Sequence, residues 1–306
     1  MPVADATRSP VGAGGRTAAR SDPALLLLLL PPLLFLLAFL VVPMAGLLRA
    51  SFSEGSRPYD VAGFSLQHYA RLLLDGYYLG VIGETLLLGL ASAIISLVVG
   101  FPVGYSLARL APAKRRLRLV IVILPLTLSL VVVVFGWLVV LGRNGMLNSI
   151  MMSFNLVERP QRLLFNRAAV LVVLIQQFLP FMILSVMSVV TQIDPALEQA
   201  SANLRANRFT TFRRVIIPLA MPGILAGLTL VFILSASAFI TPRMVGGARV
   251  QMLGSLIYEQ VTSLLNWPLG SAMSFILLVL TLLLTMGVNM ALAVRLTSTR
   301  AEQHAR

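Results

Sequence analysis

The chain of 306 residues is 58% hydrophobic and 11% charged, a balance far too apolar for a soluble domain, so most side chains are expected to face lipid. It has no cysteine, which excludes disulfides and thiolate metal sites, and its two histidines, His68 and His304, leave almost nothing for histidine-based catalysis or zinc binding. The formal net charge is +13, but the basic residues are dispersed among apolar runs, which argues against a nucleic-acid partner.

The first part of the chain combines a polar tail with a long apolar run. Residues 1–22 are rich in Gly, Ala, Ser and Pro, which cannot bury a core, and are expected to form a disordered cytoplasmic tail. The run at 24–48 is longer than the apolar part of a signal peptide and no cleavage site follows it closely, so we interpret it as an uncleaved span.

Five further apolar runs are about long enough to cross a bilayer. They predict an all-α integral membrane protein with six transmembrane helices, in which spans two to six cover roughly residues 83–108, 119–141, 168–190, 223–240 and 272–294. The expected transmembrane domain is 23–296, followed by a cytoplasmic tail at 297–306.

The basic residues predict the orientation of these spans. Positive residues are retained in the cytoplasm, and most of the 24 Lys and Arg residues fall inside when the N-terminus is cytoplasmic. The sharpest indication is the short connection "APAKRRLR" at 111–118. Both termini are therefore expected in the cytoplasm, as is the connection between spans four and five.

That connection, the 191–222 segment, is unusually polar and predicts two short helices. Asp194 followed by Pro195 is a helix start, since Asp caps free amides and Pro suits the first helical position. A break is expected near 205–207, with Asn207 as the residue best suited to a left-handed turn. Thr210 or Thr211 would cap the second helix.

The pattern alone leaves two interpretations of this helix-turn-helix open. It could rest on anionic headgroups as an amphipathic loop. Alternatively, a short helix with small residues and one carboxylate, Glu198, suits insertion into the groove of a partner protein.

The same segment resembles the coupling loop of permease subunits of binding-protein-dependent ABC importers, which carries an E-A-A pattern, then Gly, then I-x-L-P. The chain reads "IDPALEQASANLRANRFTTFRRVIIPLAMPGI" at 193–224, with Gln199 in place of the first Ala and Arg205 where the family usually has Gly. The stretch "GFPVGYSLAR" at 100–109 is similar to a motif that the family carries at the end of its second span. The stretch "FITPRMVGG" at 239–247 is similar to the spermidine/putrescine-type subgroup of that family.

The resemblance implies that two permease subunits, identical or different, form a path for a small polar solute of polyamine or related type. A periplasmic binding protein delivers the solute, and two ATPase subunits, which bind ATP and Mg, drive the transport. This chain shows no G-x-x-x-x-G-K-[ST] loop and is expected to bind no cofactor or metal and to catalyse no reaction itself. The residues expected to couple to the ATPase are Asp194, Leu197, Glu198, Ala200, Leu204, Arg205, Phe212 and Pro218.

Polar groups that could line the path are few. Gln176, Gln177, Glu84 and Glu259 are candidates, but the glutamines could equally bond between helices and the glutamates could be solvated. The alternative function is an ion-gradient-driven secondary transporter, which normally shows repeated halves and acidic sites at the midplane; neither is evident here.

Overall fold

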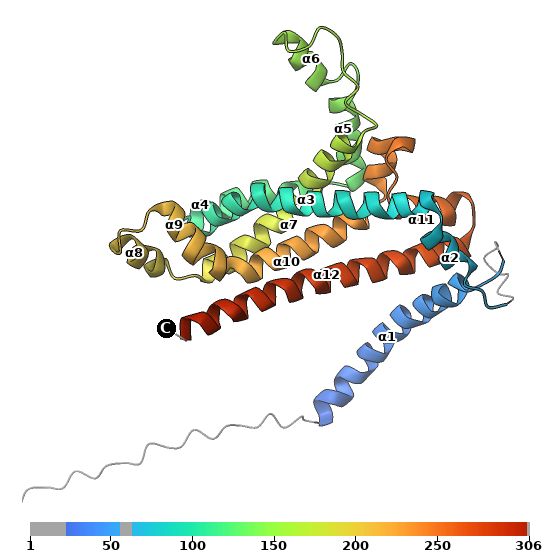
Figure 1. Cartoon of the computed structure of the whole chain (residues 1–306), viewed down its shortest axis with the longest axis horizontal. Helices are drawn as coiled ribbons and strands as arrows, with labels where there is room; N and C mark the ends of the chain where they lie inside the picture. Colours follow the sequence, from blue (N-terminus) through green and yellow to red (C-terminus); the bar gives the residue numbers. More distant parts are fainter. Residues whose placement is uncertain (1–22, 56–62, 305–306) are drawn as a thin grey trace, which may run out of the picture. The chain divides into compact units, whose positions relative to one another are not determined.

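A computed structural model describes residues 23–55 and 63–304 (Figure 1). Within these ranges six helices are long and apolar enough to cross a membrane, as the sequence predicts; they cover Leu30–Ser51, Gly76–Ala108, Leu130–Ser153, Arg167–Gln192, Arg208–Ala236 and Trp267–Gly287. The expected tail at 1–22 lies outside the described residues. The described residues from 48 onward form one compact unit, and the described residues up to 47, which include most of the first helix, belong to another.

The helices follow one another in the order α1 Pro23–Ser51, α2 Gln67–Leu74, α3 Gly76–Ala108, α4 Pro112–Thr127, α5 Leu130–Leu141, α6 Met146–Ser153, α7 Arg167–Gln192, α8 Pro195–Asn203, α9 Arg208–Thr211, η1 Phe212–Ile216, α10 Ile217–Ala236, η2 Pro242–Gly246, η3 Gly247–Arg249, α11 Leu253–Tyr258, η4 Glu259–Ser263 and α12 Trp267–His304. The labels η1, η2 and η4 denote π-helical turns, and η3 is a 3₁₀ turn.

The core of the larger unit is the bundle of α3, α7 and α10, which lie side by side (Figure 1). Small residues let their backbones approach closely, as is common between membrane helices. A Cβ on Gly104 of α3 would lie 2.8 Å from the carbonyl oxygen of Ile183 in α7, and one on Gly223 of α10 would lie 2.8 Å from that of Ser185. The glycines are therefore required for this spacing.

The prediction for the third span is wrong, because the structure shows different bounds and a break within it. Residues 119–141 form parts of two helices, because Leu128 and Ser129 have extended backbone with ψ of 145° and 133°. Pro125 already weakens the end of α4, since it has no N–H to donate to the preceding turn. The basic "APAKRRLR" connection is itself helical from Pro112, a residue suited to the first helical position.

The fifth and sixth helices also differ from the prediction. Pro218 lies in the first turn of α10 and does not end the helical path. The helical path therefore continues from α9 through the π-turn η1 into α10, which ends at Ala236 rather than at residue 240. Helix α12 continues to His304 through most of the expected C-terminal tail.

Candidate functional site

The start of α8 is organised as the sequence predicts. Asp194 is the N-cap residue, and its Oδ1 accepts a hydrogen bond of 2.8 Å from the backbone N–H of Ala196. Pro195 occupies the first helical position. Together they fix where the polar 191–222 segment turns away from the end of α7.

The end of α8 confirms the predicted break but places the left-handed residue differently. The N–H of Arg205 donates to the Ala202 carbonyl and that of Ala206 to the Ser201 carbonyl, the pair of bonds that defines a Schellman motif. The helix end thus puts Arg205 at the position that requires positive φ, and its φ is +56°. Glycine is the residue that ordinarily accepts this conformation at no cost.

The cap of the second short helix was predicted wrongly. Asn207, not Thr210 or Thr211, is the N-cap of α9, and its Oδ1 accepts a 2.7 Å bond from the N–H of Thr210. Asn207 has extended backbone with φ of −72°, as an N-cap residue requires, so it cannot also supply the left-handed turn.

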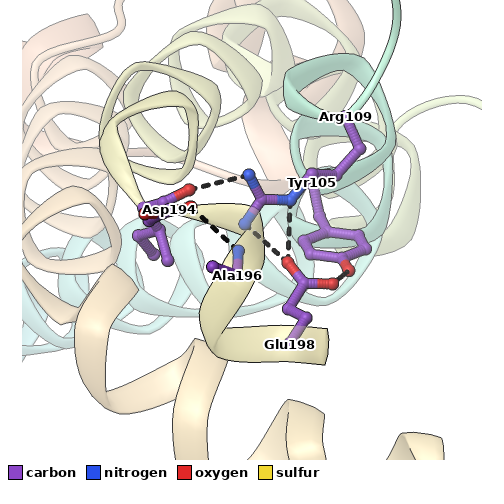
Figure 2. A network of polar contacts seen from close by, with 6 residues as sticks. Tyr105, Arg109, Asp194, Ala196 and Glu198 are labelled. Atoms are coloured by element: carbon purple, nitrogen blue, oxygen red, sulfur yellow. Dashed lines mark hydrogen bonds and ion pairs between the residues drawn. The ribbon is translucent and has the colours of Figure 1, made fainter. Parts of the chain in front are cut away.

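Glu198 points toward the end of α3 and joins a compact polar network (Figure 2). Its Oε1 lies 2.5 Å from Nη2 of Arg109 and accepts a 2.8 Å bond from Nε, while its Oε2 accepts a 2.7 Å bond from the Tyr105 hydroxyl. Arg109 also donates from Nη1 to the carbonyl of Ile193 at 2.9 Å. Both carboxylate oxygens are satisfied, and α8 is tied to the last turn of α3.

A second set of contacts supports this attachment from η1. The ring of Phe212 packs edge-on against Phe101 and Tyr105 of α3, with centroids 5.2 and 6.0 Å apart. The hydroxyls of Ser201 and Thr211 are 2.8 Å apart and link α8 to α9. The whole helix-turn-helix is thus fixed to α3 by charge, hydrogen bonds and aromatic contacts.

Large apolar side chains of the segment are exposed in this chain. Leu204 is 84% exposed, Phe209 70% and Leu197 45%. Ala200 and Pro218 are also exposed. Exposed apolar groups of this size in an otherwise polar segment are candidates for contact with a partner or with lipid.

Three of the four candidate path residues form side-chain contacts within the described chain. Gln176 accepts a 3.0 Å bond from the Trp137 indole N–H, and Gln177 accepts a 2.9 Å bond from the Thr241 hydroxyl, so both amides link helices. Glu84 pairs with Arg167 at 2.7 Å. Glu259 lies half-buried at the start of η4.

Two residues of the polar network, Tyr105 and Arg109, were not among the predicted site residues. They are four positions apart in the quoted "GFPVGYSLAR" stretch, which places them on one face of α3. That spacing is the signal in the sequence that could have found the pair. Their partner Glu198 lies 89 positions after Arg109 and comes close only in the folded chain.

Residues 100–296 match the family described as the inner membrane component of binding-protein-dependent transport systems. The chain belongs to this family. The matched region begins inside α3 and includes Tyr105, Arg109 and the entire 191–222 segment. The chain is therefore an inner membrane permease subunit of the ABC importer type.

Relatives of similar length support this assignment to the transport family. A spermidine/putrescine transport system permease protein of Haemophilus influenzae is 34% identical over 252 residues, 82% of this chain and 87% of the relative. The protein of the same description from Escherichia coli is 31% identical over 255 residues, 83% of this chain and 90% of the relative. These relatives are transport permeases, not enzymes, and place the chain in the polyamine-type group.

Solved structures confirm the permease fold. A bacterial ABC transporter involved in the import of the acidic polysaccharide alginate has a chain with a TM-score of 0.68 and 21% identity, covering 88% of this chain and 95% of that one. A chain of the MetNI methionine ABC transporter has a TM-score of 0.53 and 19% identity, covering 71% of this chain and 94% of that one.

Proposed function

We propose that the 191–222 segment of this permease docks a cytoplasmic ATPase subunit and transmits its movements to the transmembrane helices. The observation that carries the proposal is the two-sided character of the segment. Its inner side is bonded to α3 through Glu198 and Arg109, and its outer side exposes Leu204 at 84% and Phe209 at 70%.

The exposed side has the chemistry of a helix-in-groove contact. A short helix binds a groove through a few apolar anchors, and Leu197, Leu204 and Phe209 supply three within a span of thirteen positions. Their burial by a partner removes from water the largest apolar groups of the segment.

The inner side supplies the mechanical link. A displacement of α8 acts on α3 through the Arg109–Glu198 pair and on α10 through η1, which continues directly into it. Because α3 and α10 belong to the same packed bundle, a shift of the segment moves the bundle rather than deforming a loop.

The remaining parts of the importer lie on other chains in this proposal. Two ATPase subunits hold ATP and Mg, a second permease subunit completes the path, and a periplasmic protein delivers a small polar solute of polyamine or related type. The polyamine class is supported by the relatives named spermidine/putrescine permeases. In this proposal the side-chain amides of Gln176 and Gln177 hold helices together through their bonds to Trp137 and Thr241.

Co-purification with the ATPase encoded beside this chain tests the docking role. Leu204→Asp is expected to abolish recovery of the ATPase on an affinity-tagged permease, because it places a charge in the apolar contact. Leu74→Asp is the matched control: it changes a leucine that is 82% exposed at the end of α2 and is expected to retain the ATPase. Retention by Leu204→Asp and Phe209→Asp alike would contradict the proposal.

The solute class is tested separately, on the periplasmic binding protein encoded nearby. A ligand with at least one amine is expected in the purified protein by mass spectrometry. A ligand without an amine removes the polyamine assignment and leaves the permease assignment unchanged.

A further inference from the structure

A cavity of about 420 Å³ lies between the end of α5, the stretch preceding α7, and η3. Three arginines line it, one from each of these segments: Arg143, Arg162 and Arg249. Its other walls are mainly apolar and include Leu141, Leu163 and Phe165. Among the described residues that line it there is no Asp or Glu.

Within the part of the chain that the structure describes, none of the three arginines forms an ion pair with an acid. In residues 23–55 and 63–304 the ion pairs are Arg109–Glu198 and Arg167–Glu84, and neither involves the cavity. Three like charges around one cavity repel each other, so the arrangement is stabilised when an anion enters.

The cavity is held open by buried polar contacts on two of its sides. Asn148 is 0% exposed; its amide nitrogen donates to the carbonyls of Gly142 at 3.0 Å and Gln161 at 3.1 Å, and its oxygen accepts from the Gln161 N–H at 2.9 Å. These two partners directly precede Arg143 and Arg162 in the chain. Asn148 therefore fixes the relative placement of both arginines.

The third side is held by a strained backbone. Phe165 has φ of +59°, a conformation that bulky residues rarely adopt, and its N–H donates to the Val245 carbonyl at 2.9 Å. Gly247 has φ of +58°, and a Cβ there would lie 2.8 Å from the Phe165 ring. Such strain persists only where the surroundings enforce it, and it is concentrated at functional sites.

We infer that this cavity is an oxyanion-binding pocket, which takes a carboxylate or phosphate group attached to an apolar moiety. Arginine presents a planar fork of donors that fits both kinds of oxyanion, and three forks accept a group with more than one charge. The apolar walls accept the attached carbon skeleton, and a polycation is repelled. The pocket is distinct from the ATPase-docking segment, with which it shares no residue.

Two sources could supply such a group: a free organic acid or phosphate, and the headgroup of an anionic phospholipid. The experiment uses the purified full-length chain in nanodiscs. Phosphatidylcholine discs titrated with citrate and inorganic phosphate, followed by thermal melting, report the free source. Mixed phosphatidylcholine and phosphatidylglycerol discs, followed by native mass spectrometry of retained lipid, report the headgroup.

Binding in either arm is expected to weaken about 100-fold in R143Q/R162Q/R249Q, because each exposed charge pair contributes about 5-fold, or about 1 kcal/mol. The three arginines are exposed, so the variant is expected to melt like the wild type without ligand. R143K/R162K/R249K keeps the charge but loses the fork, and an intermediate affinity is expected.

The matched control R115Q/R116Q/R118Q removes the same charge from α4, whose residues do not line the pocket, and citrate affinity is expected to stay at the wild-type value. The inference is overturned if the wild type binds none of these probes, if binding survives in the triple Gln variant, or if the control loses it equally. None of these outcomes bears on recovery of the ATPase, so the two proposals fail separately.

Discussion

The Arg109–Glu198 pair is expected to hold α8 against α3, and a double-mutant cycle measures how strongly. The cycle consists of Arg109→Ala, Glu198→Ala and the double variant. Each single change removes the contacts between the two side chains and leaves the partner with its other bond, to Tyr105 or to the Ile193 carbonyl, whereas the double change removes both groups, so the cycle isolates their interaction.

The expected coupling energy lies between those of exposed and buried pairs. Exposed ion pairs contribute about 0.2–1 kcal/mol and hydrogen bonds to charged groups about 1.5–3 kcal/mol. The Arg109 and Glu198 side chains are 19% and 25% exposed, and two close contacts of 2.5 and 2.8 Å join them. A coupling of about 2 kcal/mol is therefore expected, which corresponds to about a 30-fold change in a local opening equilibrium.

Hydrogen exchange of the amides in α8 is the suitable assay, because the pair opposes local detachment rather than global unfolding. Each single variant is expected to speed exchange in Pro195–Asn203 by about 30-fold, and the double variant by little more than either. The control is Glu84→Ala, which breaks an ion pair that does not involve α8 and whose partner, Arg167, is 71% exposed. Exchange in α8 is expected to be unchanged in this variant. Single effects that simply add in the double variant would refute the reasoning.

Three further outcomes are expected. Arg205→Gly relieves the left-handed backbone at φ of +56° and is expected to slow exchange at the end of α8 by about 5-fold, or about 1 kcal/mol, as read in the same exchange experiment; faster exchange would contradict it. Gly104→Ala forces a Cβ to within 2.8 Å of the Ile183 carbonyl and is expected to cost about 1–3 kcal/mol, seen as a lower melting temperature, whereas Gly83→Ala, with nothing within 4 Å, is expected to melt like the wild type. Asn148→Ala removes three partly buried hydrogen bonds and is expected to weaken citrate binding without changing the charge of the pocket, as a titration of the purified chain measures; unchanged affinity would separate Asn148 from the pocket.

The number of spans and the two short helices could be predicted because each depends on local sequence. Apolar length decides whether a helix can cross the membrane, and Asp194 with Pro195 starts α8 by contacts within three residues. The break at 205–207 follows from the same kind of local signal. Which residue turns left-handed is decided by where α8 ends, and the Schellman bonds assign that position to Arg205 rather than to Asn207.

The interruption of the third span and the direction of Glu198 could not be predicted in the same way. Hydropathy measures how long an apolar run is, not whether it bends, so the extended pair Leu128 and Ser129 leaves no trace in it. The direction of Glu198 depends on Arg109, which lies 89 positions earlier and reaches it only after α3, α7 and α8 are in place. The cavity lined by Arg143, Arg162 and Arg249 could not be predicted for the same reason, since its three arginines come from segments far apart in the sequence.

Both carboxylate oxygens of Glu198 already accept hydrogen bonds within the chain, which restricts how an ATPase subunit could bind the 191–222 segment in the proposed function. A partner that recruits the carboxylate for itself must first break the contacts to Arg109 and Tyr105, whereas a partner that binds Leu204 and Phe209 leaves them intact. Only the second mode keeps the Arg109–Glu198 link between α8 and α3 while force is applied, because a segment released from Arg109 keeps only the Phe212 contacts to α3 and the connection through η1 to α10. In the proposed function, docking through the apolar side chains is therefore the mode in which movement of the ATPase reaches α3 through Arg109 as well as α10 through η1.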